Sequence, residues 1–279
     1  MESTHSKVTS PAGQSQAAEF PKVENVSVSA EAEAQGKTLA NGLHPKVENT
    51  EVSEVSEVTV VEGVQVTSTI LVPGSDSELS LVGAGVRGVR LPHGVELKVT
   101  VLGIYTNLEV LNHLSKYDGL SAEELLKDDQ FLLAFLEAPV DKLARVTMLL
   151  PLTGEDYAGK SGDTTEMSLK EVNKWGEAEE LALKEYREFF KQKTCPPGST
   201  IFFAVTKSGL EISQSFDSSI PKKAEYVVKN PVFGAGLVGT MLSVKGVSPH
   251  TRAKFGENMS TLLKNKIKDS SEVVANGAS

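Results

Sequence analysis

The chain has a single cysteine, Cys195, among its 279 residues, and before position 61 it has no arginine and only one aromatic residue, Phe20. One cysteine excludes an intramolecular disulfide. Residues 1–60 carry nine acidic side chains against four lysines. With so little apolar surface to bury, this segment cannot offset the entropy that it would lose on ordering. We therefore predict a disordered acidic tail over 1–57, one folded domain over 58–268 and a second disordered tail over 269–279.

Further absences narrow the classes of function. The sequence has no basic face and no run of arginines with aromatic residues, so we do not expect nucleic acid as a partner. Its apolar runs are too short for a membrane span, and its five histidines lack the spacing of a metal site. The N-terminus has neither the layout of a signal peptide nor that of a transit peptide. We expect a cytoplasmic monomer without a cofactor.

The order of the predicted elements indicates the fold class. Alternating and β-branched residues predict strands over 59–72, 79–82, 89–91, 95–105, 142–150, 200–206 and 210–216. Apolar spacings of three or four predict helices over 108–117, from 121 onward, and over 128–136, 165–191, 232–244 and 249–268. Ser121 and Glu124 form the capping-box pattern of a helix start. Because strands and helices do not alternate strictly, we predict an α+β fold with an antiparallel sheet.

Two glycine motifs suggest a nucleotide site, but their context argues against one. Gly83–Gly88 and Gly234–Gly239 both fit G-x-G-x-x-G. That chemistry needs a strand before the motif and a helix N-terminus after it, aimed at the pyrophosphate. The first motif is followed by more β-type sequence, and the second follows Lys229-Asn230-Pro231 rather than a buried strand. We predict that the glycines allow a tight bend or the close approach of another element.

Several segments together carry a resemblance to a known family. They are Gly83–Gly88, Lys98–Tyr105, Gly119–Leu126, Gly154–Tyr157, Pro196–Phe203, Phe216–Pro221, Gly239–Met241 and Val247–Pro249. In this order and spacing, over roughly residues 61–267, they resemble the chalcone isomerase family. The resemblance implies an open-faced β-sandwich, in which helices pack on one large antiparallel sheet. It also implies the cofactor-free closure of 2′-hydroxychalcones to (2S)-flavanones, and hence a polyphenol ligand and other enzymes of flavonoid biosynthesis as partners.

The resemblance also assigns site residues. Arg87, which we place in a turn between glycines, would bind the substrate oxyanion with its permanent charge and planar donors. Without the resemblance it would be a surface or salt-bridging arginine. Thr100 and Tyr157, the latter placed in a loop, would position a water that polarises the substrate ketone. Further predicted substrate-binding residues are Val89, Val99, Leu102, Thr164, Thr240 and Met241.

Two positions depart from the family pattern. Thr164 stands where the family usually has asparagine, and Met148 stands where lysine is common. Threonine cannot match both the donor and the acceptor of an amide. Two alternatives therefore remain open. The first is a non-catalytic relative that binds a flavonoid or a fatty acid or assists chalcone synthase, and the second is an unrelated α+β protein whose motifs coincide by chance.

Overall fold

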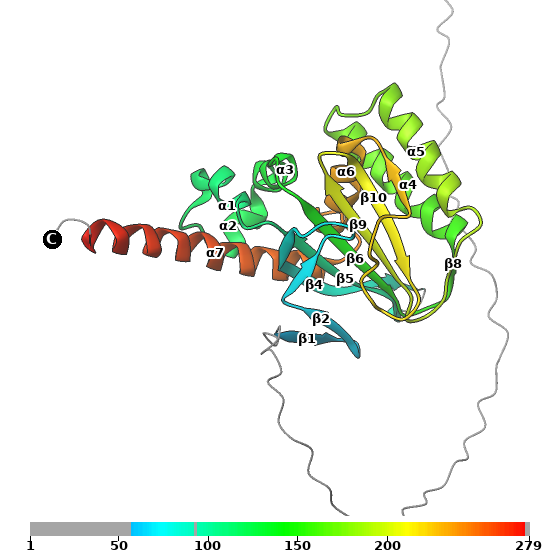
Figure 1. The fold of residues 1–279 in the computed structure, drawn as a ribbon, viewed down its shortest axis with the longest axis horizontal. Coiled ribbons are helices and arrows are strands. Elements are labelled where there is room, and N and C mark those ends of the chain that lie inside the picture. Colours follow the sequence, from blue (N-terminus) through cyan, green and yellow to red (C-terminus); the bar gives the residue numbers. More distant parts are fainter. Residues whose placement is uncertain (1–56, 92–93, 277–279) are drawn as a thin grey trace, which may run out of the picture. The chain divides into compact units, whose positions relative to one another are not determined.

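The computed structural model describes residues 57–91 and 94–276, so the tail predicted over 1–57 lies outside it except for Glu57. Its main feature is a seven-stranded antiparallel sheet with the order β11-β10-β9-β6-β5-β4-β3 (Figure 1). The strands are β3 Thr69–Leu71, β4 Glu78–Arg90, β5 Glu96–Thr106, β6 Lys142–Met148, β9 Thr200–Thr206, β10 Gly209–Ser215 and β11 Tyr226–Val228. The hairpin of β1 Val58–Val61 with β2 Val64–Thr67 and a two-stranded sheet of β7 Leu152–Thr153 with β8 Thr194–Cys195 complete the strands.

Helices pack on this sheet, which confirms the predicted α+β class. They are α1 Val110–His113, the 3₁₀ turn η2 Ser115–Tyr117, α2 Ala122–Lys127, α3 Asp129–Glu137, α4 Gly154–Glu171, α5 Glu177–Phe190, α6 Pro231–Leu242 and α7 Pro249–Asn276. Helix α6 packs against β9 and β10, and α7 packs against β4. Helix α7 continues past Lys268, where we expected the last helix to end. Within the described ranges, no helix is both long and apolar enough to cross a bilayer.

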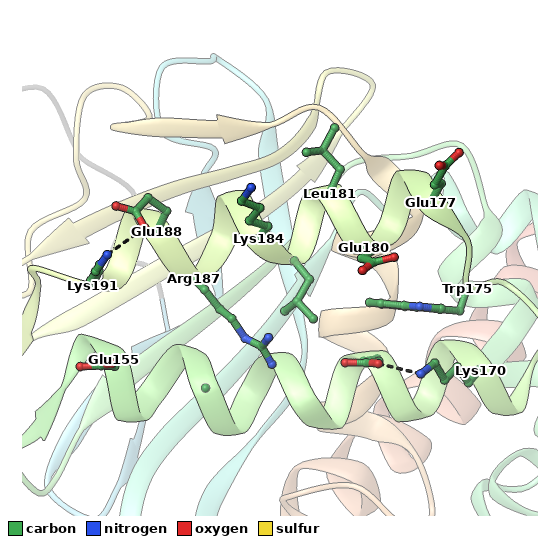
Figure 2. A pocket seen from close by; sticks show the side chains of 13 residues that line it. Glu155, Lys170, Trp175, Glu177, Glu180, Leu181, Lys184, Arg187, Glu188 and Lys191 are labelled. Atoms are coloured by element: carbon green, nitrogen blue, oxygen red, sulfur yellow. Dashed lines mark hydrogen bonds and ion pairs between the residues drawn. The ribbon is translucent and has the colours of Figure 1, made fainter.

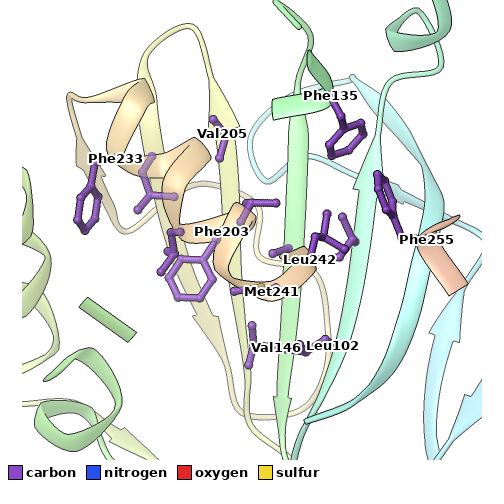
Figure 3. Packing of buried hydrophobic residues seen from close by; sticks show 14 of the residues in the cluster. Leu102, Phe135, Val146, Phe203, Val205, Phe233, Met241, Leu242 and Phe255 are labelled. Atoms are coloured by element: carbon purple, nitrogen blue, oxygen red, sulfur yellow. The ribbon is translucent and has the colours of Figure 1, made fainter. Parts of the chain in front are cut away.

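Each face of the sheet buries its own apolar cluster. Successive side chains of a strand point to opposite faces. On β5, Leu102 joins the cluster under the helices, whereas Val101 joins a smaller cluster that includes Val66 of β2. Figure 3 shows Leu102 and Val146 of the sheet near Met241 and other residues of α6. The sheet thus separates two apolar clusters, and the larger one lies under the helices.

The bend predicted at Gly83–Gly88 is wrong, because β4 runs unbroken through it from Glu78 to Arg90. The glycines instead let α7 approach the strand. A Cβ added to Gly85 would lie 2.6 Å from the backbone nitrogen of Thr251. Gly234–Gly239 lies within α6, where a Cβ on Gly236 would lie 2.9 Å from Leu169. Neither motif joins a strand to a helix N-terminus, so the close-approach interpretation is confirmed.

The loop predicted around Tyr157 is also wrong. Helix α4 begins at Gly154, eleven residues before the predicted start at Thr165. Thr153 caps it, because the Thr153 hydroxyl accepts from the Asp156 amide at 3.0 Å. Gly159 and Gly162 weaken the helical signal in the sequence, but a Cβ on Gly162 would lie 2.5 Å from Leu183 of α5. The packing of α5 thus requires Gly162, the residue that weakens the helical signal. Tyr157 lies in the first turn of α4.

Candidate functional site

Arg87, Thr100 and Met148 form a row across three neighbouring strands. Thr100 of β5 is the direct partner of Arg87 on β4 and of Met148 on β6. Cross-strand partners point to the same face of a sheet. Met148 belongs to the apolar cluster under the helices. The strand register therefore places the Arg87 and Thr100 side chains on the helix-covered face.

A small hollow of about 30 Å³ lies where this row meets α4 and α6. Seven of the nine predicted site residues line it, namely Arg87, Thr100, Leu102, Tyr157, Thr164, Thr240 and Met241. They come from β4, β5, α4 and α6, so the fold brings together residues that are far apart in the sequence. This convergence is the main geometric support for a site here.

Val89 and Val99 were predicted to line the cleft, but neither borders this hollow. Val99 is the extra residue of β5 at a register irregularity, because Arg87 pairs with Thr100 and Gly88 pairs with Lys98. Val89 pairs with Leu97 beyond this irregularity, two residues further along β4 than Arg87, and does not reach the hollow. The apolar wall is supplied instead by Leu102 and Val146 from the sheet, together with Leu237 and Val247.

Two polar groups in the hollow have unused hydrogen-bonding capacity. No described residue forms a hydrogen bond or ion pair with the Arg87 guanidinium. Thr100 is 0% exposed, and its hydroxyl is a buried polar atom without a partner in the described part of the chain. A buried polar atom left unpaired costs about 1–3 kcal/mol. Such groups are rare in folded proteins and call for an explanation, and a ligand that accepts hydrogen bonds would supply one.

Tyr157 completes the set of donors. Its ring is stacked on Phe203, with 6.2 Å between ring centroids, and lies 5.6 Å from the ring of Phe190. Burial raises the pKa of the Tyr157 hydroxyl well above its ordinary value, and the charge of Arg87 opposes this rise only in part. The phenol therefore stays protonated at neutral pH. It is an uncharged donor whose hydroxyl has no hydrogen-bond partner among the described residues.

Sequence reasoning missed five lining residues: Val146, Lys160, Ser161, Leu237 and Val247. A signal for two of them existed. Lys160, Ser161 and Thr164 follow Tyr157 by three, four and seven positions, which is the spacing of one helical face. That spacing carries information only if the helix starts before Tyr157, and we had placed its start later.

The structure also locates the two departures from the family pattern. The Thr164 hydroxyl lines the hollow but donates to the Lys160 carbonyl at 2.8 Å, so its proton is used within α4. Met148 is 1% exposed and packs in the apolar cluster beside Thr100. A lysine there would have to bury its ammonium or extend it toward Thr100.

A larger, apolar groove of about 940 Å³ adjoins the hollow, and Thr164 and Thr240 line both. It lies over α3, α4 and α6. Four of the exposed large apolar side chains of the described chain border it: Met167, Val172, Val232 and Val244. An apolar ligand that entered the hollow past Thr164 and Thr240 could extend along the apolar side chains of this groove.

A second groove, of about 870 Å³, separates α4 from α5 (Figure 2). Its charges largely pair with one another or with nearby side chains. Lys170 bonds to Glu166 and lies 5.6 Å from the Trp175 ring, and Arg187 pairs with Asp163. Cys195 lies elsewhere and is fully buried, and burial raises the pKa of its thiol to about 11. Cys195 is therefore a packing residue, and neither the second groove nor this thiol competes with the hollow as a reactive site.

The family profile that matches the chain and the similar sequences carry the same description. The profile of the family described as chalcone-flavanone isomerase matches residues 61–262. The chain is 34% identical to chalcone–flavanone isomerase of Ipomoea batatas over 215 residues, 76% of this chain and 88% of that protein. It is equally identical to chalcone–flavanone isomerase 1 of Arabidopsis thaliana over 215 residues, 76% of this chain and 87% of that protein. A third relative, chalcone–flavanone isomerase 2-A of Glycine max, is 34% identical over 212 residues, 75% of this chain and 93% of that protein.

Among solved structures, a fatty-acid binding protein of Arabidopsis thaliana superposes with a TM-score of 0.60. The match covers 74% of this chain and 99% of that one, at 21% identity. At that identity the likeness shows the fold alone. The sequence relatives and the structural neighbour thus carry different functional descriptions on a shared architecture.

Proposed function

The chain belongs to the chalcone-flavanone isomerase family, and from that premise we propose that it closes 2′-hydroxychalcones, such as naringenin chalcone, to (2S)-flavanones. One observation carries the proposal: Arg87, Thr100 and Tyr157 face one hollow, and no described residue uses their donors. These donors match a substrate with a phenolate oxygen and a ketone oxygen.

The reaction is an intramolecular addition, and its nucleophile belongs to the substrate. The 2′-hydroxyl loses its proton, and the resulting oxygen forms a bond to the β-carbon of the enone. The electron pair of the carbon–carbon double bond moves toward the ketone oxygen as an enolate, which then takes a proton at the α-carbon. The proton lost from the 2′-hydroxyl is matched by the proton gained at the α-carbon, so the product is an isomer of the substrate. This step requires no oxidant, reductant or cofactor.

The protein's part is to hold the reacting atoms together and to stabilise charge. Arg87 would bind the 2′-oxygen as an anion, because its guanidinium is charged at every working pH. Thr100 and Tyr157 would donate toward the ketone oxygen, where negative charge develops. Well-positioned reacting pairs reach effective concentrations of about 10⁵–10⁸ M. Positioning alone can therefore supply much of the acceleration.

Binding must enlarge the hollow, because about 30 Å³ is far below the roughly 300–1,000 Å³ of pockets that hold small-molecule ligands. Lys160 and Met241 line it and have long, flexible side chains. Their movement would open the hollow toward Thr164, Thr240 and the apolar groove beyond. We propose that one ring of the substrate lies near Arg87 and that the rest extends toward this groove.

A stereochemical turnover assay tests the proposal. Purified protein is mixed with naringenin chalcone, and the loss of chalcone absorbance and the enantiomeric ratio of the flavanone are measured. We expect acceleration over the spontaneous reaction and an excess of the (2S) product. A rate equal to the spontaneous one, with racemic product, would refute catalysis.

A second candidate function is the binding of a fatty acid without catalysis. The apolar groove favours it, since a carboxylate on Arg87 would let an acyl chain run past Thr164 and Thr240 along Met167 and Val232. The fatty-acid binding neighbour has the same fold. Mass spectrometry of the ligand that co-purifies with the protein distinguishes the candidates. A bound fatty acid together with racemic turnover would favour this second function over the first.

A further inference from the structure

Two further hydroxyls adjoin the hollow and are hydrogen-bonded to each other. Ser161 lies on α4, one turn after Tyr157, and lines the hollow with Arg87 and Thr100. Tyr186 on α5 is fully buried. The hydroxyl oxygens of Ser161 and Tyr186 are 2.8 Å apart. The Ser161 hydroxyl also donates to the main-chain carbonyl of Tyr157 at 2.7 Å.

The direction of these bonds follows from counting protons. A serine hydroxyl has one proton and two lone pairs. The carbonyl of Tyr157 cannot donate, so the Ser161 proton is committed to it. Tyr186 must then be the donor in its bond to Ser161. The Ser161 oxygen keeps one lone pair, and toward a ligand it can only accept.

Packing holds this arrangement in place. The Tyr186 ring lies 5.1 Å from that of Phe190 and 5.6 Å from that of Phe233. Burial raises the pKa of the Tyr186 hydroxyl well above its ordinary value, so its proton stays available as a donor. Gly162 lets α5 approach α4 at this point. The serine therefore cannot readily turn its proton toward the hollow.

The polar groups that line the hollow consequently differ in what they can offer a ligand. Arg87, Thr100 and Tyr157 can donate. The Thr164 and Thr240 hydroxyls donate to the carbonyls of Lys160 and Leu237, as Ser161 does to that of Tyr157. Only Ser161 among these three is held by a second hydroxyl from another helix. A ligand that complements both kinds of group needs acceptor oxygens for the donors and a hydroxyl for Ser161.

We propose that Ser161, oriented by Tyr186, accepts a hydrogen bond from a ring hydroxyl of the bound polyphenol and so selects among hydroxylated ligands. The inference rests on the proposed function and adds a specificity residue to it. Tyr186 is a positioning residue, since it acts through Ser161. Removing the hydroxyl at one ring position of the ligand should then weaken binding more than removing any other hydroxyl.

Calorimetric titration with a panel of flavanones tests this. The panel holds naringenin and analogues that each lack one of its hydroxyls. We expect the wild-type protein to prefer naringenin over one analogue by about 3- to 10-fold, the contribution of one hydrogen bond. Ser161→Ala should bring that ratio close to one and leave the other ratios unchanged. Tyr186→Phe, which removes only the donor, should lower the same ratio part of the way.

Thr165→Val is the matched control. The Thr165 hydroxyl donates to the Ser161 carbonyl at 2.8 Å from the next turn of α4, but Thr165 does not line the hollow. It should lower the melting temperature and leave every ratio as in the wild type. If Ser161→Ala weakens all ligands equally or none, while Arg87→Met weakens them all, the inference fails and the proposed function stands. If the wild type binds no member of the panel, both the proposed function and this inference are refuted.

Discussion

Arg87 and Thr100 are direct cross-strand partners, and both side chains point into the same hollow beneath α4 and α6. The register irregularity that follows Arg87 leaves Val99 of β5, beside Thr100, without a partner on β4. Next to the pair, the Ser248 hydroxyl donates to the Val86 carbonyl at 2.7 Å and ties the start of α7 to the strand. Two adjacent donors are thus fixed by the sheet before any ligand arrives.

The unpaired Thr100 hydroxyl predicts a conflict between stability and activity. Thr100→Val removes a buried polar atom that has no partner and keeps the shape of the side chain. We expect the free energy of unfolding to rise by about 1 kcal/mol. We expect kcat/KM for naringenin chalcone to fall by about 10²-fold, because a donor to the developing oxyanion is lost. Denaturant titration and the chalcone assay measure the two effects.

Thr147→Val is the control for that substitution. The Thr147 and Thr200 hydroxyls are buried and hydrogen-bonded at 2.9 Å, on the sheet face opposite the hollow. The valine would leave Thr200 unpaired, so the free energy of unfolding should fall by about 1–3 kcal/mol while kcat/KM is retained. Equal destabilisation by both variants would mean that Thr100 has a structural partner, contrary to our account.

The ionisation of Tyr157 should be suppressed in the folded protein. Tyrosine in an unfolded chain has a pKa of about 10, whereas burial raises that of Tyr157. Since the folded-state pKa is the higher one, the stabilising contribution is complete below pH 10 and is lost as the pH rises further. In an alkaline titration of tyrosinate absorbance, the difference between wild type and Tyr157→Phe should appear only on unfolding. A difference that titrates near pH 10 in the folded protein would show that Tyr157 is exposed to water.

Because α7 lies so close to β4, even a methyl group at position 85 should lower the free energy of unfolding. Gly85→Ala places a methyl group 2.6 Å from the backbone of Thr251 and must push α7 outward. We expect a loss of about 1–3 kcal/mol in the free energy of unfolding. Gly159→Ala is the matched change, because nothing lies within 4 Å of its added Cβ and it lies in the interior of α4. There we expect a gain of up to about 1 kcal/mol, and similar effects at both positions would contradict the described packing.

The elements best predicted from the sequence are those with strong local signals. The strands at 200–206 and 210–216 agree with β9 and β10 to within one residue. The capping box of Ser121 and Glu124 is present, with both reciprocal bonds formed. In these places the local preference and the tertiary structure agree, so a short window of sequence suffices.

The missed elements are those in which tertiary contacts override local preference. Gly83–Gly88 suggests a bend, yet the approach of α7 keeps β4 extended there. Gly162 argues locally against a helix, yet Leu183 of α5 needs the space that it leaves. The site followed the same rule. The resemblance supplied Arg87, Thr100 and Tyr157. The place of Ser161 on the same helical face as Tyr157 depends on the start of α4 at Gly154, and its bond to Tyr186 depends on the packing of α5.

The central claim is that the unpaired guanidinium of Arg87 drives ring closure, and one comparison tests it most directly. Arg87→Met and Arg187→Met each remove one arginine charge, but Arg187 lies on the exposed surface of α5, paired with Asp163. Both variants and the wild type are assayed for the rate and the enantiomeric excess of flavanone formed from naringenin chalcone. We predict that Arg87→Met loses at least about 10²-fold in kcat/KM and that Arg187→Met keeps the wild-type rate and the (2S) excess. Equal activity of the two variants would contradict the account.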